Sequence, residues 1–98
     1  MRGHGEYKMP GGKLVVADVE IRGGRLARVA ISGDFFLEPD SALDAIDAAL
    51  TGAPVHSGAD VLAAAVEAGL PPGTRMYGVA PEAVAVAVCR AIDDKAQA

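Results

Sequence analysis

The chain has 98 residues, a formal net charge of −4, 51% hydrophobic residues and only 4% aromatic residues. This length predicts one domain spanning residues 1–98 that folds without metals or disulfides, with a core built mostly from Ala, Val, Leu and Ile. The acidic balance and scattered basic residues argue against nucleic-acid binding, and the apolar runs are too short to cross a membrane. We therefore expect a cytoplasmic protein.

The sequence offers few candidates for a metal or redox site. The single cysteine, Cys89, cannot form an internal disulfide, and only His4 and His56 could join it as metal ligands. No spacing typical of a metal site results. We expect this chain to bind no cofactor and no metal, and Cys89 to be a buried, inert thiol.

Two similar strings predict a β-meander at the start of the chain. Gly-Gly-Lys-Leu at residues 11–14 recurs as Gly-Gly-Arg-Leu at residues 23–26, and a β-branched run follows each copy. A further short strand is predicted over residues 6–9. In the first run Val15, Ala17, Val19 and Ile21 share one face, and in the second run Ala27, Val29 and Ile31 do so.

The register of this hairpin can also be predicted. A two-residue loop at Gly23-Gly24 would pair Val19 with Arg28 and mix the two faces of the sheet. A three-residue loop that includes Arg22 pairs Val19 with Ala27 instead, and we favour it.

The only two phenylalanines, Phe35 and Phe36, follow the meander side by side. Neighbouring side chains of an extended segment point to opposite faces. The odd-numbered apolar face places Phe35 in the core and leaves Phe36 for a partner, although a bulge at Gly33 and Asp34 would reverse this parity. The alternative, that both rings are core at a bend, stays open.

Three helices are predicted in the rest of the chain. The first starts with Pro39 in its first turn and ends before Gly52; the second starts at Ser57, as a capping residue, and ends at Gly69. The third starts at Pro81 and continues to about Lys95, although the alternating stretch at residues 83–89 also fits a strand. The predicted fold class is α+β: a small antiparallel β-meander followed by about three helices on one face.

No catalytic motif emerges from these elements. The Gly-Gly-Lys string at residues 11–13 lacks the spacing and the following helix of a phosphate-binding loop, so a simple turn is favoured. Asp34 and Glu38 are predicted to flank a helix start and to interact with its dipole. Neither His4 nor His56 has a sequence neighbour that suggests a catalytic triad.

Taken together, these pieces resemble the C-terminal accessory domain of lipoate–protein ligases. The matching features occur in order: Gly-Gly-x-Leu at residues 11–14, a glycine-containing hairpin at residues 22–24, Gly-Asp-Phe-Phe at residues 33–36 and Leu-x-Gly at residues 50–52. The match is good over about the first 56 residues and rests on pattern beyond them. The resemblance implies an α+β fold similar to the iron–sulfur scaffold proteins of the SufE and NifU type, whose cysteine ligands are missing here.

The resemblance also implies a role. In that family a large domain binds ATP and lipoate, forms lipoyl-adenylate and transfers the lipoyl group, and the small domain assists adenylation. Since the large domain's motifs are absent, the chain resembles a separate accessory subunit whose partner is the catalytic lipoate–protein ligase subunit. Lys13, Asp34 and Phe36 are its candidate interface residues. The alternative is a free-standing protein-interaction module with the same fold and no ligase role.

Overall fold

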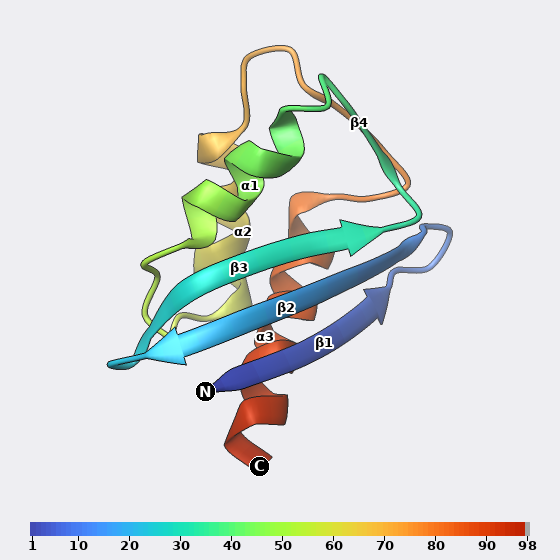
Figure 1. The fold of residues 1–98 in the computed structure, drawn as a ribbon. Coiled ribbons are helices and arrows are strands. Elements are labelled where there is room, and N and C mark those ends of the chain that lie inside the picture. Colours follow the sequence, from blue (N-terminus) through green and yellow to red (C-terminus); the bar gives the residue numbers. More distant parts are fainter. Residues whose placement is uncertain (98) are drawn as a thin grey trace.

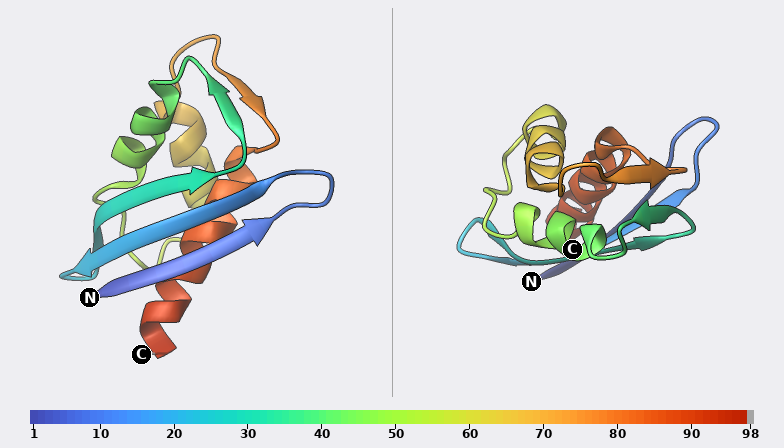
Figure 2. Two further views of the ribbon diagram at one scale, coloured as in Figure 1. Left: turned by 45° about the vertical axis from the view of Figure 1, so that its right-hand side comes forward. Right: turned by 90° about the horizontal axis from the view of Figure 1, so that it is seen from above.

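The computed structural model describes residues 1–97 and consists of a three-stranded antiparallel sheet, a two-stranded ribbon and three helices. The sheet has the order β1-β2-β3, and the helices cover one of its faces (Figures 1 and 2). This arrangement confirms the predicted α+β class. In chain order the elements are β1 (Arg2–Lys8), β2 (Leu14–Arg22), β3 (Arg25–Gly33), β4 (Phe36–Glu38), α1 (Ala42–Leu50), α2 (Ala59–Gly69), β5 (Arg75–Tyr77) and α3 (Pro81–Gln97).

The β2–β3 hairpin has a different register from the predicted one. Its loop is the two-residue Gly23-Gly24, with φ values of +60° and +75°. These left-handed conformations match the tight turns that suit hairpins. A two-residue loop alone would pair Val19 with Arg28, and the predicted loop would pair it with Ala27. Val19 in fact pairs with Val29, because the register shifts at a β-bulge after Glu20.

The bulge explains why the predicted three-residue loop was wrong. Ile21 pairs with Leu26 and Glu20 pairs with Arg28, so Ala27 is the extra residue. Ala27 and Arg28 are both exposed, and Leu26 is buried where Ala27 was expected. The bulge therefore keeps Leu26, Val29 and Ile31 on the inward face of the sheet without a longer loop.

Strand β1 is longer than predicted and contacts α3 through its glycines. Gly3 and Gly5 are buried on the face toward the helix. A Cβ atom built on Gly5 would collide with the carbonyl oxygen of Ala87 and the backbone nitrogen of Ala91, and would lie 2.9 Å from the carbonyl carbon of Arg90. The backbone of α3 thus packs directly on β1, which only a glycine permits.

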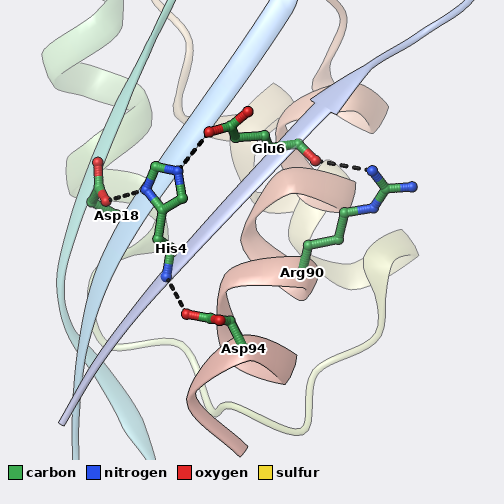
Figure 3. Close-up of polar contacts among 5 residues, drawn as sticks. All are labelled: His4, Glu6, Asp18, Arg90 and Asp94. Carbon is green, nitrogen blue, oxygen red and sulfur yellow. Dashed lines mark hydrogen bonds and ion pairs between the residues drawn. The ribbon is translucent and has the colours of Figure 1, made fainter. Parts of the chain in front are cut away.

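Side chains of α3 also bind the outer edge of β1 (Figure 3). The His4 backbone N–H donates to the Asp94 carboxylate at 3.1 Å, and the Arg90 guanidinium donates to the Glu6 carbonyl at 2.9 Å. The same guanidinium lies 4.9 Å from the centre of the Tyr7 ring, within the range of a cation–π contact. His4 thus lies in an ordered strand that begins four residues before the predicted one.

The opposite edge of the sheet is covered in a similar way by α1. The Ile31 backbone N–H donates to the carboxylate of Asp47 at 3.0 Å. Burial raises the pKa of Asp47, and the hydrogen bond from Ile31 opposes that rise. Further along this edge, Leu26 exchanges backbone hydrogen bonds with Gly52 and Ala53.

The helix starts differ from two of the predictions. Helix α1 begins at Ala42 rather than near Pro39, because residues 39–42 form a turn in which the Ala42 N–H donates to the Pro39 carbonyl at 3.0 Å. Helix α2 is preceded by Gly58 at its N-cap, without a side-chain cap from Ser57. The predicted end of α2 at Gly69 is confirmed, as are the helical character of α3 and its start at Pro81.

The core lies between the sheet and the helices. Its largest fully buried side chains are Val15, Leu26, Ile46, Leu50, Leu62, Val66, Val84 and Val88. All buried hydrophobic side chains in the described part of the chain are valine, leucine, isoleucine or alanine, as predicted. None of the helices within residues 1–97 is both long enough and apolar enough to cross a membrane.

Candidate partner interface

The β4–β5 ribbon presents two aromatic rings at one end of the molecule. Phe36 of β4 pairs directly with Tyr77 of β5, and the two residues are 74% and 44% exposed. On the opposite face, Leu37 is buried and Met76 is half-buried against the core. Alternation along each strand therefore orients one face of the ribbon inward and leaves an aromatic pair facing solvent.

The two phenylalanines have the orientations predicted for them. Phe35 is half-buried and packs against the core, while Phe36 is the most exposed large hydrophobic residue in the part of the chain described. Strand β5 and Tyr77 were not predicted. Their signal in the sequence is short: Arg-Met-Tyr following the turn residues Pro71-Pro72-Gly73.

Lys13 lies at the same end, where the β1–β2 loop meets the segment after β5 (Figure 1). The Lys13 backbone N–H donates to the Gly78 carbonyl at 2.8 Å. Gly78 has a φ of +80°, and a Cβ atom built there would lie 2.5 Å from Cγ of Lys13. The Lys13 stem thus packs over a glycine next to Tyr77, and its exposed side chain belongs to the aromatic end.

Asp34 is held beside Lys13 by the turn between β3 and β4. Its backbone N–H donates to the Leu14 carbonyl at 3.2 Å, and its side chain is exposed. Because β4 separates Asp34 from α1, the predicted contact of Asp34 with the helix dipole is wrong. The structure therefore brings the predicted residues Lys13, Asp34 and Phe36 to one end of the molecule; their role in binding stays a prediction.

A hollow of about 240 Å³ adjoins the aromatic pair between β4 and α1. Its lining is apolar apart from one carboxylate, and consists of Phe35, Phe36, Leu37, Asp40 and Leu43. This hollow is the concave part of the candidate interface.

His4 forms a separate polar cluster on the uncovered face of the sheet (Figure 3). Its Nδ1 lies 2.7 Å from the Asp18 carboxylate and its Nε2 lies 2.7 Å from the Glu6 carboxylate. These hydrogen bonds, first to Glu6 and then to Asp18, raise the pKa of His4 to about 9. Both ring nitrogens are thus bonded to carboxylates, and His4 links β1 to Asp18 of β2 on the surface of the sheet.

Sequence reasoning missed this cluster because one of its partners comes from the next strand. Glu6 lies two residues after His4 and so shares its face of β1, whereas Asp18 is opposite His4 on β2. Cys89 is half-buried on α3, and burial raises the pKa of its thiol further above the physiological range. Within residues 1–97, no group of three His, Cys, Asp or Glu side chains could hold a metal ion.

Comparisons with known proteins identify a structural relative. No protein-family model matches this chain, and neither does any curated protein sequence. Among solved structures, it matches a chain from a structural analysis of an archaeal lipoylation system, described as a bi-partite lipoate protein ligase and its E2 lipoyl domain from Thermoplasma acidophilum. The TM-score is 0.70 at 24% identity.

The two chains share one fold. The match covers 90% of this chain and 94% of the Thermoplasma acidophilum chain. It also spans the second half of the sequence, where the resemblance to lipoate–protein ligase accessory domains rested on pattern alone. The shared fold therefore extends over both the meander and the helices.

Proposed function

We propose that this chain is the cytoplasmic accessory subunit of a two-chain lipoate–protein ligase. It binds a separate catalytic subunit and assists the ATP-dependent adenylation of lipoate, while the catalytic subunit binds ATP and lipoate. The observation that carries the proposal is the structural match, over 90% of this chain, to a chain from a bi-partite lipoate protein ligase system. The ordered motifs of residues 11–52 point to the same family independently of that match.

The surface supports a binding role rather than catalysis by this chain. The Gly-Gly-Lys segment is a turn into β2, not the start of a helix that could bind phosphate. The exposed Phe36 and Tyr77 instead provide the aromatic residues in which protein interfaces are enriched, and Lys13 and Asp34 beside them suit the polar rim of such an interface. We assign this end of the molecule to the contact with the catalytic subunit.

Reconstitution tests the proposal. A ligase subunit that contains only the catalytic domain is incubated with ATP and lipoate, and pyrophosphate release is measured with and without this chain. We expect little release from either protein alone and a large increase when they are combined. If no catalytic subunit from the native cell is activated, the proposal fails, and a free-standing interaction module becomes the better explanation.

Matched variants connect the activation to the surface. Phe36→Ser removes the exposed ring, and Val61→Ser alters another exposed apolar residue, 60% exposed in the first turn of α2. We expect Phe36→Ser to raise the concentration of this chain needed for half-maximal activation, and Val61→Ser to leave it unchanged. Equal effects of the two substitutions would place the contact elsewhere.

A further inference from the structure

The hollow beside Phe36 has the size and lining of a receptor for one apolar side chain. Its volume is about 240 Å³ and four of its five lining residues are Phe or Leu. An apolar cavity of about 150 Å³ is enough to hold a benzene ring. One aromatic or long aliphatic side chain therefore fits the space, and its burial would cover a ring that is 74% exposed in the free chain.

The charges around this hollow are mostly negative. Asp40 lies in its wall, and Asp34, Glu38 and Asp44 are exposed nearby in the same stretch of chain. Within residues 1–97, none of these four carboxylates takes part in an ion pair. Two basic residues also lie close by: Arg75 pairs with Glu38 across the ribbon, and Lys13 lies in the loop beside Asp34 and Gly78.

We propose that the hollow receives an apolar side chain of a protein segment in which Lys or Arg residues flank that side chain. The apolar group would pack on Phe36 and Leu43, and the flanking cations would lie near Asp40 and its acidic neighbours. Nucleic acid is a poor occupant because its phosphates would meet these carboxylates. This inference rests on the proposed function in one respect: the segment is assigned to the catalytic ligase subunit.

Binding measurements with the catalytic subunit test the chemistry directly. Phe36→Ser is expected to weaken association about 30-fold or more, as the loss of a central aromatic contact does. Asp40→Lys is expected to weaken it about 10-fold and to reduce its dependence on salt, because an attraction becomes a repulsion. Val61→Ser and Asp93→Lys, which alter an exposed apolar residue on α2 and an exposed carboxylate on α3, are the matched controls and should change affinity less than about twofold.

The outcomes separate this inference from the proposed function. If the catalytic subunit binds and is activated, but Phe36→Ser and Asp40→Lys behave like their controls, the inference is wrong and the proposed function stands. If no catalytic subunit binds, the proposed function fails, and a peptide titration then decides whether the hollow has the proposed chemistry.

The peptide probes are two alanine-based peptides with one central leucine, flanked by arginines in one and by glutamates in the other. They are titrated to millimolar concentration into the isotopically labelled chain and followed by NMR. The proposal predicts shifts at the amides of Phe36, Leu37, Asp40 and Leu43 with the arginine peptide only, and their loss in Phe36→Ser. Absence of these shifts, or equal shifts with the glutamate peptide, overturns it.

Discussion

Phe36 lies directly opposite Tyr77 across β4 and β5, and both rings face solvent. Cross-strand aromatic pairs contribute about 0.2–1 kcal/mol to a sheet, so this pair stabilises the ribbon only modestly. One of the two phenylalanines of this chain, Phe36, is thus exposed at the surface. We therefore expect Phe36 to contribute to binding more than to the stability of the fold.

The two phenylalanines should respond differently to truncation. Phe35 is half-buried against the core, so Phe35→Ala is expected to lower the free energy of unfolding by about 2 kcal/mol, less than for a fully buried ring. Phe36→Ala should lower it by less than about 1 kcal/mol. Denaturant titration of both variants measures this, and equal losses would contradict the orientation described for these rings.

Gly5 should tolerate no side chain. In Gly5→Ala the new methyl group would meet the backbone of α3 at Ala87 and Ala91, which cannot move without displacing the helix. We expect a loss of stability at or above the upper end of the about 1–3 kcal/mol typical of overpacking. Gly58→Ala is the control, since a Cβ there meets no atom within 4 Å; its thermal midpoint should change much less.

Alkaline pH should destabilise the protein through His4. Its pKa is about 9 in the folded state and 6.5 ordinarily, so protonation is favoured by folding. The stabilisation is complete below about pH 6.5 and is lost as the pH rises through 9. NMR titration of the His4 ring protons gives the folded pKa, and denaturant midpoints at several pH values follow the stability.

His4→Gln is the matched variant for that experiment. It removes the titrating group, so the fall in stability between pH 6.5 and 9 should become smaller. A folded pKa for His4 close to 6.5 would show that Glu6 and Asp18 do not hold the ring as a cation.

Asp47 should contribute more to the stability of the protein than an exposed carboxylate on the same helix does. Asp47→Ala leaves the half-buried Ile31 N–H without its acceptor and is expected to cost about 1–3 kcal/mol. Asp47→Asn keeps a carbonyl oxygen at the same place and should restore most of the loss. Asp44→Ala, on the exposed side of α1, is the control. Hydrogen exchange of the Ile31 amide should accelerate in Asp47→Ala but not in Asp44→Ala.

The sequence predicted the features of this fold that depend on local periodicity. The inward positions Val15, Ala17 and Val19, and the helical character of residues 81–97, follow from spacing and start signals. The hairpin register did not follow, because the bulge at Ala27 depends on how two strands twist against each other. Strand β5 was missed because three residues carry too little pattern to be distinguished from a loop.

The candidate interface, too, could be predicted from the sequence only in part. Phe36 could be predicted to be exposed because neighbouring side chains of a strand point to opposite faces, and Phe35 takes the inward one. Tyr77 and Asp40 could not, because their proximity to Phe36 arises from the pairing of β4 with β5 and from the turn before α1. The partners of His4 lie within reach of one another only once β1 and β2 are aligned.

The carboxylates and the guanidinium that bind the edge strands of the main sheet also affect how readily the protein aggregates at high concentration. Unpaired strand edges are templates on which copies of a chain stack and aggregate. Here Asp94 and Arg90 occupy backbone groups of β1, and Asp47 occupies one of β3. A second molecule would have to displace them before it could extend the sheet. Contacts from α1 and α3 therefore oppose the addition of a further strand at either edge of the sheet. The aromatic pair Phe36 and Tyr77 stays exposed elsewhere on the molecule.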